Sequence, residues 1–170
     1  MLPRSTVLNA KEAFEGSAKI QVKSAQPGWI SLRIAPDMET RAQVVAFFRS
    51  QIESLPSDLC EKLSLAVDEL LGNAIEHGCD TPYCRVEFTF IRTARMLLFH
   101  VKDAGHGFSL DDIPHAALNN PPEEPLRHVE YRSQNGMRPG GFGIMMVKQI
   151  ADELMYNQHG NEVVMVKYLD

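Results

Sequence analysis

The chain has 170 residues, of which 44% are hydrophobic, enough to build the core of one domain of ordinary size. Its net charge of −5 argues against nucleic acid as the main partner. No apolar run approaches the ~18 residues needed to cross a bilayer, and the N-terminus lacks the apolar centre of a secretory signal. We therefore expect a cytoplasmic protein that binds neither nucleic acid directly nor a membrane.

The cysteines are Cys60, Cys79 and Cys84, an odd number without the spacing of a disulfide framework. A reducing cytoplasm fits that usage. His77 together with Cys79 and Cys84 could form a metal cluster. The sequence favours two or three small buried thiols beside a histidine at a helix end.

The first part of the chain predicts an extension, a strand and a helix. Residues 1–25 have weak periodicity and mixed polarity, and this extension could end in a short strand near residues 19–22. Residues 29–34 alternate between apolar and polar, which indicates a strand. Pro36 and Asp37 then introduce a helix over about residues 39–54, with one apolar face.

The next helix has strong start and stop signals. Pro56 precedes Ser57 and Asp58, either of which can cap the helix. The helix should run through Glu76, and Gly78 supplies a C-terminal stop. Its apolar residues fill a wide arc of the helical wheel.

Two polar residues of this helix, Glu69 and Asn73, lie four positions apart and therefore share one face at the border of the apolar arc. Asp68 points to the opposite, solvated side. A carboxylate and a carboxamide so placed can serve a metal ion and a proton transfer together. The alternative is a polar pair that only marks where burial ends.

The second half predicts more strands and one more helix. Residues 83–92 and 96–103 alternate and should pair as an antiparallel hairpin. Residues 109–140 hold five of the ten prolines and predict a long functional loop. A helix over 144–154 and a strand over 162–169 follow. Antiparallel strands with helices gathered on one face make a two-layer α+β sandwich.

The residues after the hairpin form an unusual turn. Asp103 continues the apolar face of its strand, and Gly105 and Gly107 follow at intervals of two. The glycines allow close backbone approach and positive φ, which could clear space for a flat ring while Asp103 accepts hydrogen bonds from its amine. A glycine turn capped by the aspartate explains the pattern equally well.

A glycine-rich segment immediately precedes the last predicted helix. It consists of Arg138, Gly140, Gly141, Phe142 and Gly143, with Pro139 inside it. Free amides at a helix N-terminus bind phosphate well where glycines let the anion approach. The segment is neither a Walker loop nor a dinucleotide fingerprint. Alone, it could equally be a flexible hinge.

The three segments in this order resemble the N box and the two glycine boxes of the GHKL ATP-binding superfamily, with its Bergerat fold. The helix most resembles that of the bacterial anti-sigma factor serine/threonine kinases. The resemblance covers roughly residues 29–169. The matching residues are Glu69, Asn73, Ala74, His77, Gly78, Asp103, Gly105, Gly107, Gly141 and Gly143.

The resemblance implies roles for the first two segments. Asn73 would bind Mg²⁺ through its side-chain oxygen, and Glu69 would be the general base that takes a proton from a serine hydroxyl. Asp103 would bind the adenine amino group of ATP. Gly105 and Gly107 would make room for the base.

For the third segment, the resemblance implies phosphate contacts from the amides of Gly140, Gly141 and Gly143, with Phe142 between them. Residues 109–140 would form the ATP lid. Arg138 is a further candidate for the γ-phosphate, because a planar cation beside a phosphate loop suits that charge. A solvated lid arginine is the alternative.

The resemblance also implies an activity and partners. Residues 26–170 would be an ATP- and Mg²⁺-dependent serine/threonine protein kinase domain that phosphorylates an anti-anti-sigma (STAS-type) protein. A sigma factor is a second possible partner, and a homodimer is expected. The alternatives are an ATP-gated protein-binding switch without phosphotransfer and an orphan histidine-kinase-like ATPase domain. For a histidine kinase, residues 1–28 are too short to supply the phospho-accepting hairpin.

Overall fold

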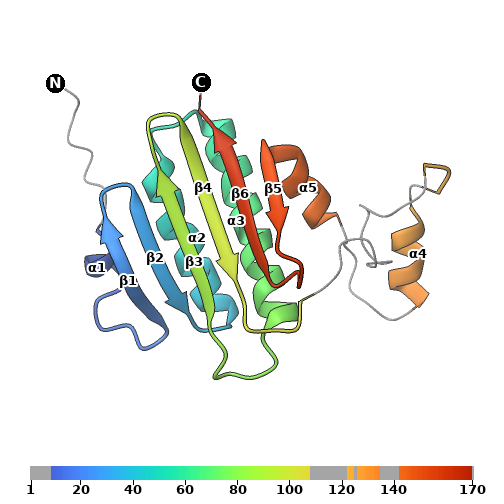
Figure 1. The fold of residues 1–170 in the computed structure, drawn as a ribbon, viewed down its shortest axis with the longest axis horizontal. Coiled ribbons are helices and arrows are strands. Elements are labelled where there is room, and N and C mark those ends of the chain that lie inside the picture. The colour runs from blue at the N-terminus through green and yellow to red at the C-terminus, as the bar shows by residue number, and fades with distance from the viewer. Residues whose placement is uncertain (1–8, 108–121, 125, 135–141, 170) are drawn as a thin grey trace.

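The computed structural model describes residues 9–107, 122–124, 126–134 and 142–169. Figure 1 shows how the helices and strands follow one another along the chain. They are α1 Ala10–Ala13, β1 Ile20–Gln26, β2 Trp29–Ile34, α2 Met38–Ile52, α3 Ser57–Gly78, β3 Val86–Arg92, β4 Met96–Lys102, α4 Arg127–Gln134, α5 Gly143–Ile150, β5 Glu153–Tyr156 and β6 Glu162–Tyr168.

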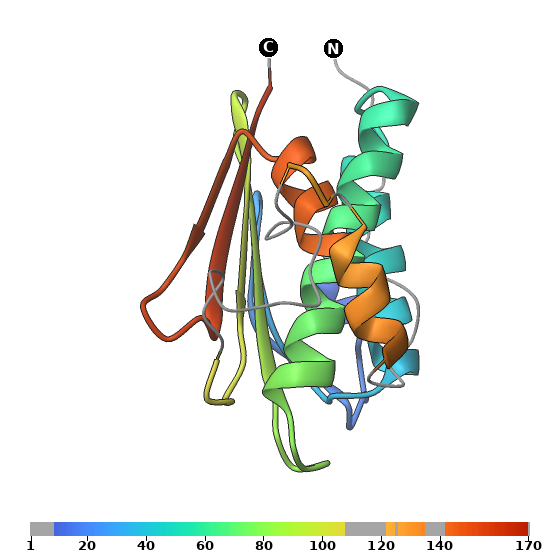
Figure 2. The ribbon, with the colours of Figure 1, turned by 90° about the vertical axis from the view of Figure 1, so that its right-hand side faces the viewer.

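The strands form one antiparallel sheet in the part of the chain that the structure describes. Their order across this six-stranded sheet is β1-β2-β3-β4-β6-β5. Helices α2, α3 and α5 form a second layer on one face of the sheet (Figure 2). The two-layer α+β sandwich expected from the sequence is therefore confirmed.

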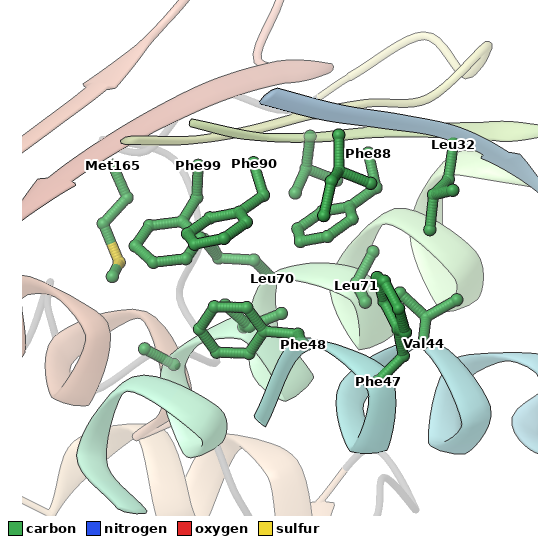
Figure 3. Close-up of a cluster of buried hydrophobic side chains, with 14 of the residues drawn as sticks. Leu32, Val44, Phe47, Phe48, Leu70, Leu71, Phe88, Phe90, Phe99 and Met165 are labelled. Carbon is green, nitrogen blue, oxygen red and sulfur yellow. The ribbon is translucent and has the colours of Figure 1, made fainter. Parts of the chain in front are cut away.

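The core lies between these two layers. Alternate strand residues point toward the helices, so that Leu32 on β2 pairs with Phe88 on β3, which pairs in turn with Val101 on β4. Phe48 on α2 packs edge-to-face on Phe90 and Phe99, with ring centroids 5.2 Å from each (Figure 3). The alternation predicted for β2, β3 and β4 thus produces the buried face.

The opposite face of the sheet also carries apolar side chains. Strand register places Trp29, Ile91, Leu98 and Val166 next to one another across β2, β3, β4 and β6. The three packed helices lie on the other side (Figure 2). Trp29 stays half-exposed in this row.

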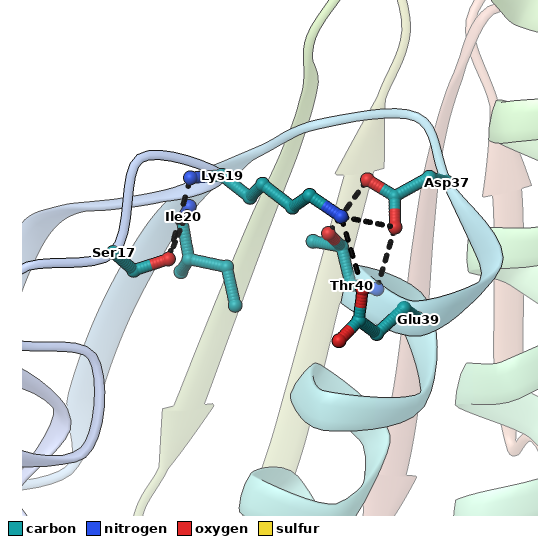
Figure 4. A network of polar contacts seen from close by, with 6 residues as sticks. All are labelled: Ser17, Lys19, Ile20, Asp37, Glu39 and Thr40. Carbon is teal, nitrogen blue, oxygen red and sulfur yellow. Dashed lines mark hydrogen bonds and ion pairs between the residues drawn. The ribbon is translucent and has the colours of Figure 1, made fainter.

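The chain before β2 contributes a full strand to the sheet. β1 is longer than the short strand expected near residues 19–22, and it extends past residue 25. Ile20 at its start is buried in the core. Next to it, Lys19 Nζ lies 3.4 Å from Asp37 and 3.0 Å from Glu39 at the start of α2 (Figure 4).

Helix α3 differs from the sequence prediction in two details. It begins at Ser57 with Pro56 at the N-cap position and has no side-chain cap, so the capping expected from Ser57 or Asp58 is wrong. Asp68 is not simply solvated. Its two oxygens accept hydrogen bonds of 2.6 Å from Arg41 on α2, whose side chain is only 15% exposed. This bidentate pair ties α2 to α3.

The predicted helix over residues 144–154 is wrong at its C-terminal end. α5 ends at Ile150, where Ala151 turns to an extended conformation. The chain then forms β5, a four-residue edge strand paired with β6. The predicted long loop 109–140 also contains a helix, α4, while most of that segment lies outside the described residues. Among the described helices, none combines the length and apolar character that a membrane span needs.

The expectation of free thiols is wrong for two cysteines. Cys79 and Cys84 form a disulfide across the loop between α3 and β3, with their Cα atoms 5.5 Å apart. Cys60 is the buried thiol, and its Sγ donates a hydrogen bond to Ile52 O at 3.0 Å. Within the described ranges, no cluster of three or more histidine, cysteine or acidic side chains could hold a metal ion.

Candidate functional site

Asn73 on α3 lines a pocket between this helix and the ends of β4, β5 and β6. The residues around the pocket are Leu70, Asn73, Ala74, His77, Gly78, Val101, Asp103, Gly107, Tyr156, Gly160, Asn161, Glu162 and Val163. The structure therefore brings Asn73, Asp103 and Gly107 together, as the sequence predicts. Glu69, Gly105 and Gly143 lie beside this pocket and not in its wall.

The side chain of Asn73 has an unusual environment. Its Nδ2 atom is buried and has no hydrogen-bond partner among the described residues. A buried amide without a partner costs free energy, and its presence calls for a ligand or another explanation. This unpartnered polar group makes the pocket a candidate binding site.

Asp103 follows β4 at the mouth of the pocket. Its Oδ1 accepts a 2.8 Å hydrogen bond from Gly105 N–H, so the carboxylate does cap its own turn. Burial raises the pKa of Asp103 above its usual value, and the N–H groups of Gly105 and of Asp103 itself act in the opposite direction. The Asp103 carboxylate thus holds its own turn at the pocket.

The glycines around Asp103 are required by close packing. A Cβ atom on Gly78, at the end of α3, would collide with the Asp103 carboxylate. A Cβ on Gly105 would lie 2.8 Å from Gly78 Cα. Gly107 has a φ of 71° and faces His159 O, where a Cβ would also collide. The His-Gly end of α3 and the Asp-x-Gly-x-Gly turn are therefore two halves of one packed unit.

Glu69 lies one helical turn before Asn73 and reaches the first residue of α5. Its carboxylate contacts Gly143 so closely that a Cβ there would overlap it. The N-terminus of a helix favours negative charge, because its first amides have no helical partners. Gly143, expected as a phosphate ligand through its amide, thus also admits the Glu69 carboxylate.

The remainder of the second glycine segment is only partly described. Phe142 occupies the N-cap position of α5 and is 43% exposed. Arg138, Gly140 and Gly141 lie outside the described residues, so their predicted phosphate contacts stay predictions.

Tyr156 and Asn161 are among the pocket residues that sequence reasoning missed. Burial, and then the negative charge of Glu69, raise the pKa of Tyr156 to about 12, so its phenol stays protonated near neutral pH. Tyr156 ends β5, which the sequence assigned partly to a helix. Asn161 lies in the turn between β5 and β6, where asparagine is common for local reasons. Neither residue therefore carried a signal of its own.

Comparison with protein families decides the assignment. The family described as the histidine kinase-like ATPase domain matches residues 34–167, which include α3, the Asp103 turn and α5. The chain belongs to this family. The predicted resemblance to the GHKL superfamily is thus confirmed, and membership implies that the domain binds ATP.

A curated relative is also similar to the chain. The serine-protein kinase RsbW of Oceanobacillus iheyensis is 28% identical over 111 residues, a match that covers 64% of this chain and 65% of the relative. The chain therefore spans just under two thirds of the length of this relative.

The residues of the family site fit the groups that such a domain binds. Asn73 and Asp103 line one pocket, and a side-chain amide with a carboxylate acceptor are groups that an adenine nucleotide can use. For Mg²⁺, Asn73 in the pocket wall offers its side-chain amide oxygen. This ion usually takes few protein ligands and fills its octahedron with water and phosphate oxygens. The donor set therefore fits Mg²⁺ only together with a nucleotide.

Proposed function

We propose that the protein is an ATP- and Mg²⁺-dependent serine/threonine protein kinase of the anti-sigma type. The placement of Glu69 carries this proposal. Its carboxylate lies at the N-terminus of α5 beside Gly143, one turn of α3 away from Asn73. A base at the border between a nucleotide pocket and a phosphate-binding helix end is well placed for a hydroxyl that attacks the terminal phosphate.

In the proposed mechanism each residue has one task. Asp103 accepts a hydrogen bond from the adenine amino group and so orients the nucleotide. Asn73 would hold Mg²⁺, which neutralises phosphate charge when bound. Glu69 takes the proton of the incoming serine hydroxyl. The α5 N-terminus, with the amides predicted for Gly140, Gly141 and Gly143, stabilises negative charge on the phosphates.

The substrate and partners belong to the same proposal. An anti-anti-sigma (STAS-type) protein would carry the phosphorylated serine, and a sigma factor would be the second partner of a homodimer in the cytoplasm. The similarity to a protein named serine-protein kinase supports the kinase reading. The nucleotide would select between partners through their different affinities for the two nucleotide states.

The second candidate function is an ATP-gated switch that binds a partner without phosphotransfer. It is favoured by the buried, unpartnered Nδ2 atom of Asn73 and by the partly buried Asp103 carboxylate, because these groups account for binding without phosphotransfer. The two candidates differ only in whether Glu69 acts as a base.

The decisive experiment incubates the protein with ATP, Mg²⁺ and a candidate STAS-type partner, and detects phosphoserine by mass spectrometry. Glu69→Gln should lower the transfer rate by about 100-fold or more, because general-base catalysis contributes about 10²–10⁴-fold. ATP affinity should stay close to wild type in the same variant. Phosphoserine formation at the wild-type rate by Glu69→Gln would exclude Glu69 as the base. Tight ATP binding by the wild type without transfer to any partner would favour the switch.

A further inference from the structure

The turn between β5 and β6, residues 157–161, lies against the loop that carries Asp103. The backbone N–H of Asp103 donates to Asn161 O at 3.0 Å. In return, Asn161 Nδ2 donates to Gly105 O at 3.1 Å and to Asp103 O at 3.4 Å. One asparagine thus holds the loop on both sides of Asp103.

A second asparagine fixes the orientation of Asn161. Asn157 Nδ2 donates to Asn161 Oδ1 at 2.8 Å, and Asn157 Oδ1 accepts a 3.1 Å hydrogen bond from Asn161 N–H. Because the Asn161 side-chain oxygen is occupied by a donor, its nitrogen must face the two carbonyl groups. Asn157 therefore fixes the orientation in which Asn161 Nδ2 donates to the Asp103 loop.

Steric fit adds a third constraint between the turn and the loop. Gly107 packs against His159 O with no room for a Cβ atom. Asn161 and Gly160 also line the pocket that contains Asp103 and Asn73. The turn is therefore both a wall of the pocket and the support of the loop, although it lies more than fifty residues away in sequence.

We infer that Asn161 is a positioning residue for adenine recognition, which acts by holding Asp103 with its carboxylate directed at the exocyclic amine. The inference rests on the proposed ATP site. In this inference, the β5–β6 turn holds Asp103 in the position from which it distinguishes a 6-amino purine from a 6-oxo purine. Asn161 itself need not touch the nucleotide.

The test compares binding of ATP, ADP and inosine triphosphate by titration calorimetry, since inosine triphosphate has an oxygen where ATP has the amine. Asn161→Ala should weaken the binding of ATP and the binding of ADP by the same factor, about tenfold for two lost hydrogen bonds. The binding of inosine triphosphate should weaken less. The ratio of the affinity for ATP to the affinity for inosine triphosphate, which is the preference for ATP, should therefore shrink. A preference equal to that of the wild type, measured well below the melting temperature, would overturn the inference even if the variant is less stable.

Two further variants sharpen the result. Asn161→Asp keeps the shape and the acceptor for Asn157 but turns a carboxylate oxygen toward two carbonyl groups, so it should lose at least as much preference as Asn161→Ala. Retention of the wild-type preference by Asn161→Asp would also overturn the inference. Asn9→Ala, an N-cap change at the start of α1 on the opposite edge of the sheet, is the matched control and should leave the preference unchanged.

The same titration separates this inference from the proposed function. A wild-type protein that binds ATP and inosine triphosphate equally would contradict the assignment of Asp103 to the amine. A wild-type preference that persists in both Asn161 variants would leave the ATP site intact and overturn only the role of Asn161.

Discussion

Glu69 reaches the first residue of α5 because Gly143 has no side chain. The contact joins two segments that are more than seventy residues apart in sequence. It also explains why a glycine, a poor helix former, begins this helix. A larger residue would gain helix propensity and lose the position of the carboxylate.

Gly143→Ala should therefore impair phosphotransfer more than nucleotide binding. The added Cβ displaces the Glu69 carboxylate, and the transfer rate should fall by about 100-fold, within the range that a general base contributes. The backbone amide is retained, so ATP affinity should change far less. Transfer assays and calorimetry on the same protein check both effects.

The double variant supplies the control for this prediction. In a Glu69→Gln background the base is already absent, so Gly143→Ala should lower the transfer rate little further. If the loss of transfer rate in the double variant equals the product of the losses in the two single variants, Gly143 acts through something other than Glu69.

Asp103 illustrates a cost of function at the residue scale. Its folded-state pKa is raised by burial, so the ionised carboxylate destabilises the folded protein. This penalty grows as the pH rises from the unfolded-state pKa to the raised folded-state pKa, and it is complete above that. Asp103→Asn removes the charge and keeps an oxygen for Gly105 N–H. At pH 7 the variant should melt at the same or a higher temperature than the wild type, yet bind ATP at least about tenfold more weakly.

Thermal unfolding at neutral pH and near pH 4 measures the stability part of this prediction. The difference in melting temperature between the Asp103→Asn variant and the wild type should shrink at the lower pH. There Asp103 is increasingly protonated in both the folded and the unfolded state. A variant that is clearly less stable than the wild type at pH 7 would contradict it.

At the scale of elements, α3 and the hairpin β3–β4 could be predicted because their patterns are long and regular. Ser57–Gly78 shows many turns of helical periodicity, and β3 and β4 alternate over seven residues each. Glu69, Asn73 and Asp103 stood out because each polar group interrupts such a pattern. The site was predictable to that extent.

β5 was not predictable in the same way. Leu154 continues the spacing of the apolar residues in α5, and four residues are too few to show alternation. What ends the helix is distant in sequence. Asp152 N–H donates to Val166 O at 2.9 Å, and its side chain accepts from Lys167 Nζ and Tyr168 N–H at 2.8 and 2.6 Å. Tyr156 was missed because it ends this strand, and Asn161 because it lies in the turn that follows it.

The Cys79–Cys84 disulfide gives an element-scale prediction. The bond closes a short loop between α3 and β3, and loop-closure entropy predicts that reduction costs about 2 kcal/mol of stability. Denaturant unfolding with and without dithiothreitol measures this difference. The Cys79→Ser/Cys84→Ser variant should match the reduced wild type and show no response to the reductant. Equal stability of the oxidised and reduced wild type would contradict the prediction.

At the scale of the whole molecule, the segment before β2 belongs to the packed structure as far as it is described. Ile20 is only 2% exposed and β1 covers the edge of β2. Ile20→Ala should therefore lower the free energy of unfolding by about 2–4 kcal/mol, as for other buried aliphatic side chains. Gln21→Ala, the exposed neighbour on the opposite face, is the matched control and should stay within about 0.5 kcal/mol of the wild type.

Equal effects of the two variants in denaturant unfolding would indicate that the segment before residue 26 is a separable extension. A large effect confined to Ile20 would show that the domain begins at β1 or earlier. ATP affinity should change little in either variant, because β1 is one edge strand of the sheet and the pocket lies at β4, β6 and β5 toward the other edge.

Trp29 is the single tryptophan of the chain and lies half-exposed in the apolar row on the face of the sheet that α2, α3 and α5 leave open. Strand register puts it at the end of β3 and the start of β4, opposite the end that carries Asp103. We therefore expect its emission to respond to association on this face. Nucleotide in the pocket should change that emission little, since the pocket lies at the other end of β4.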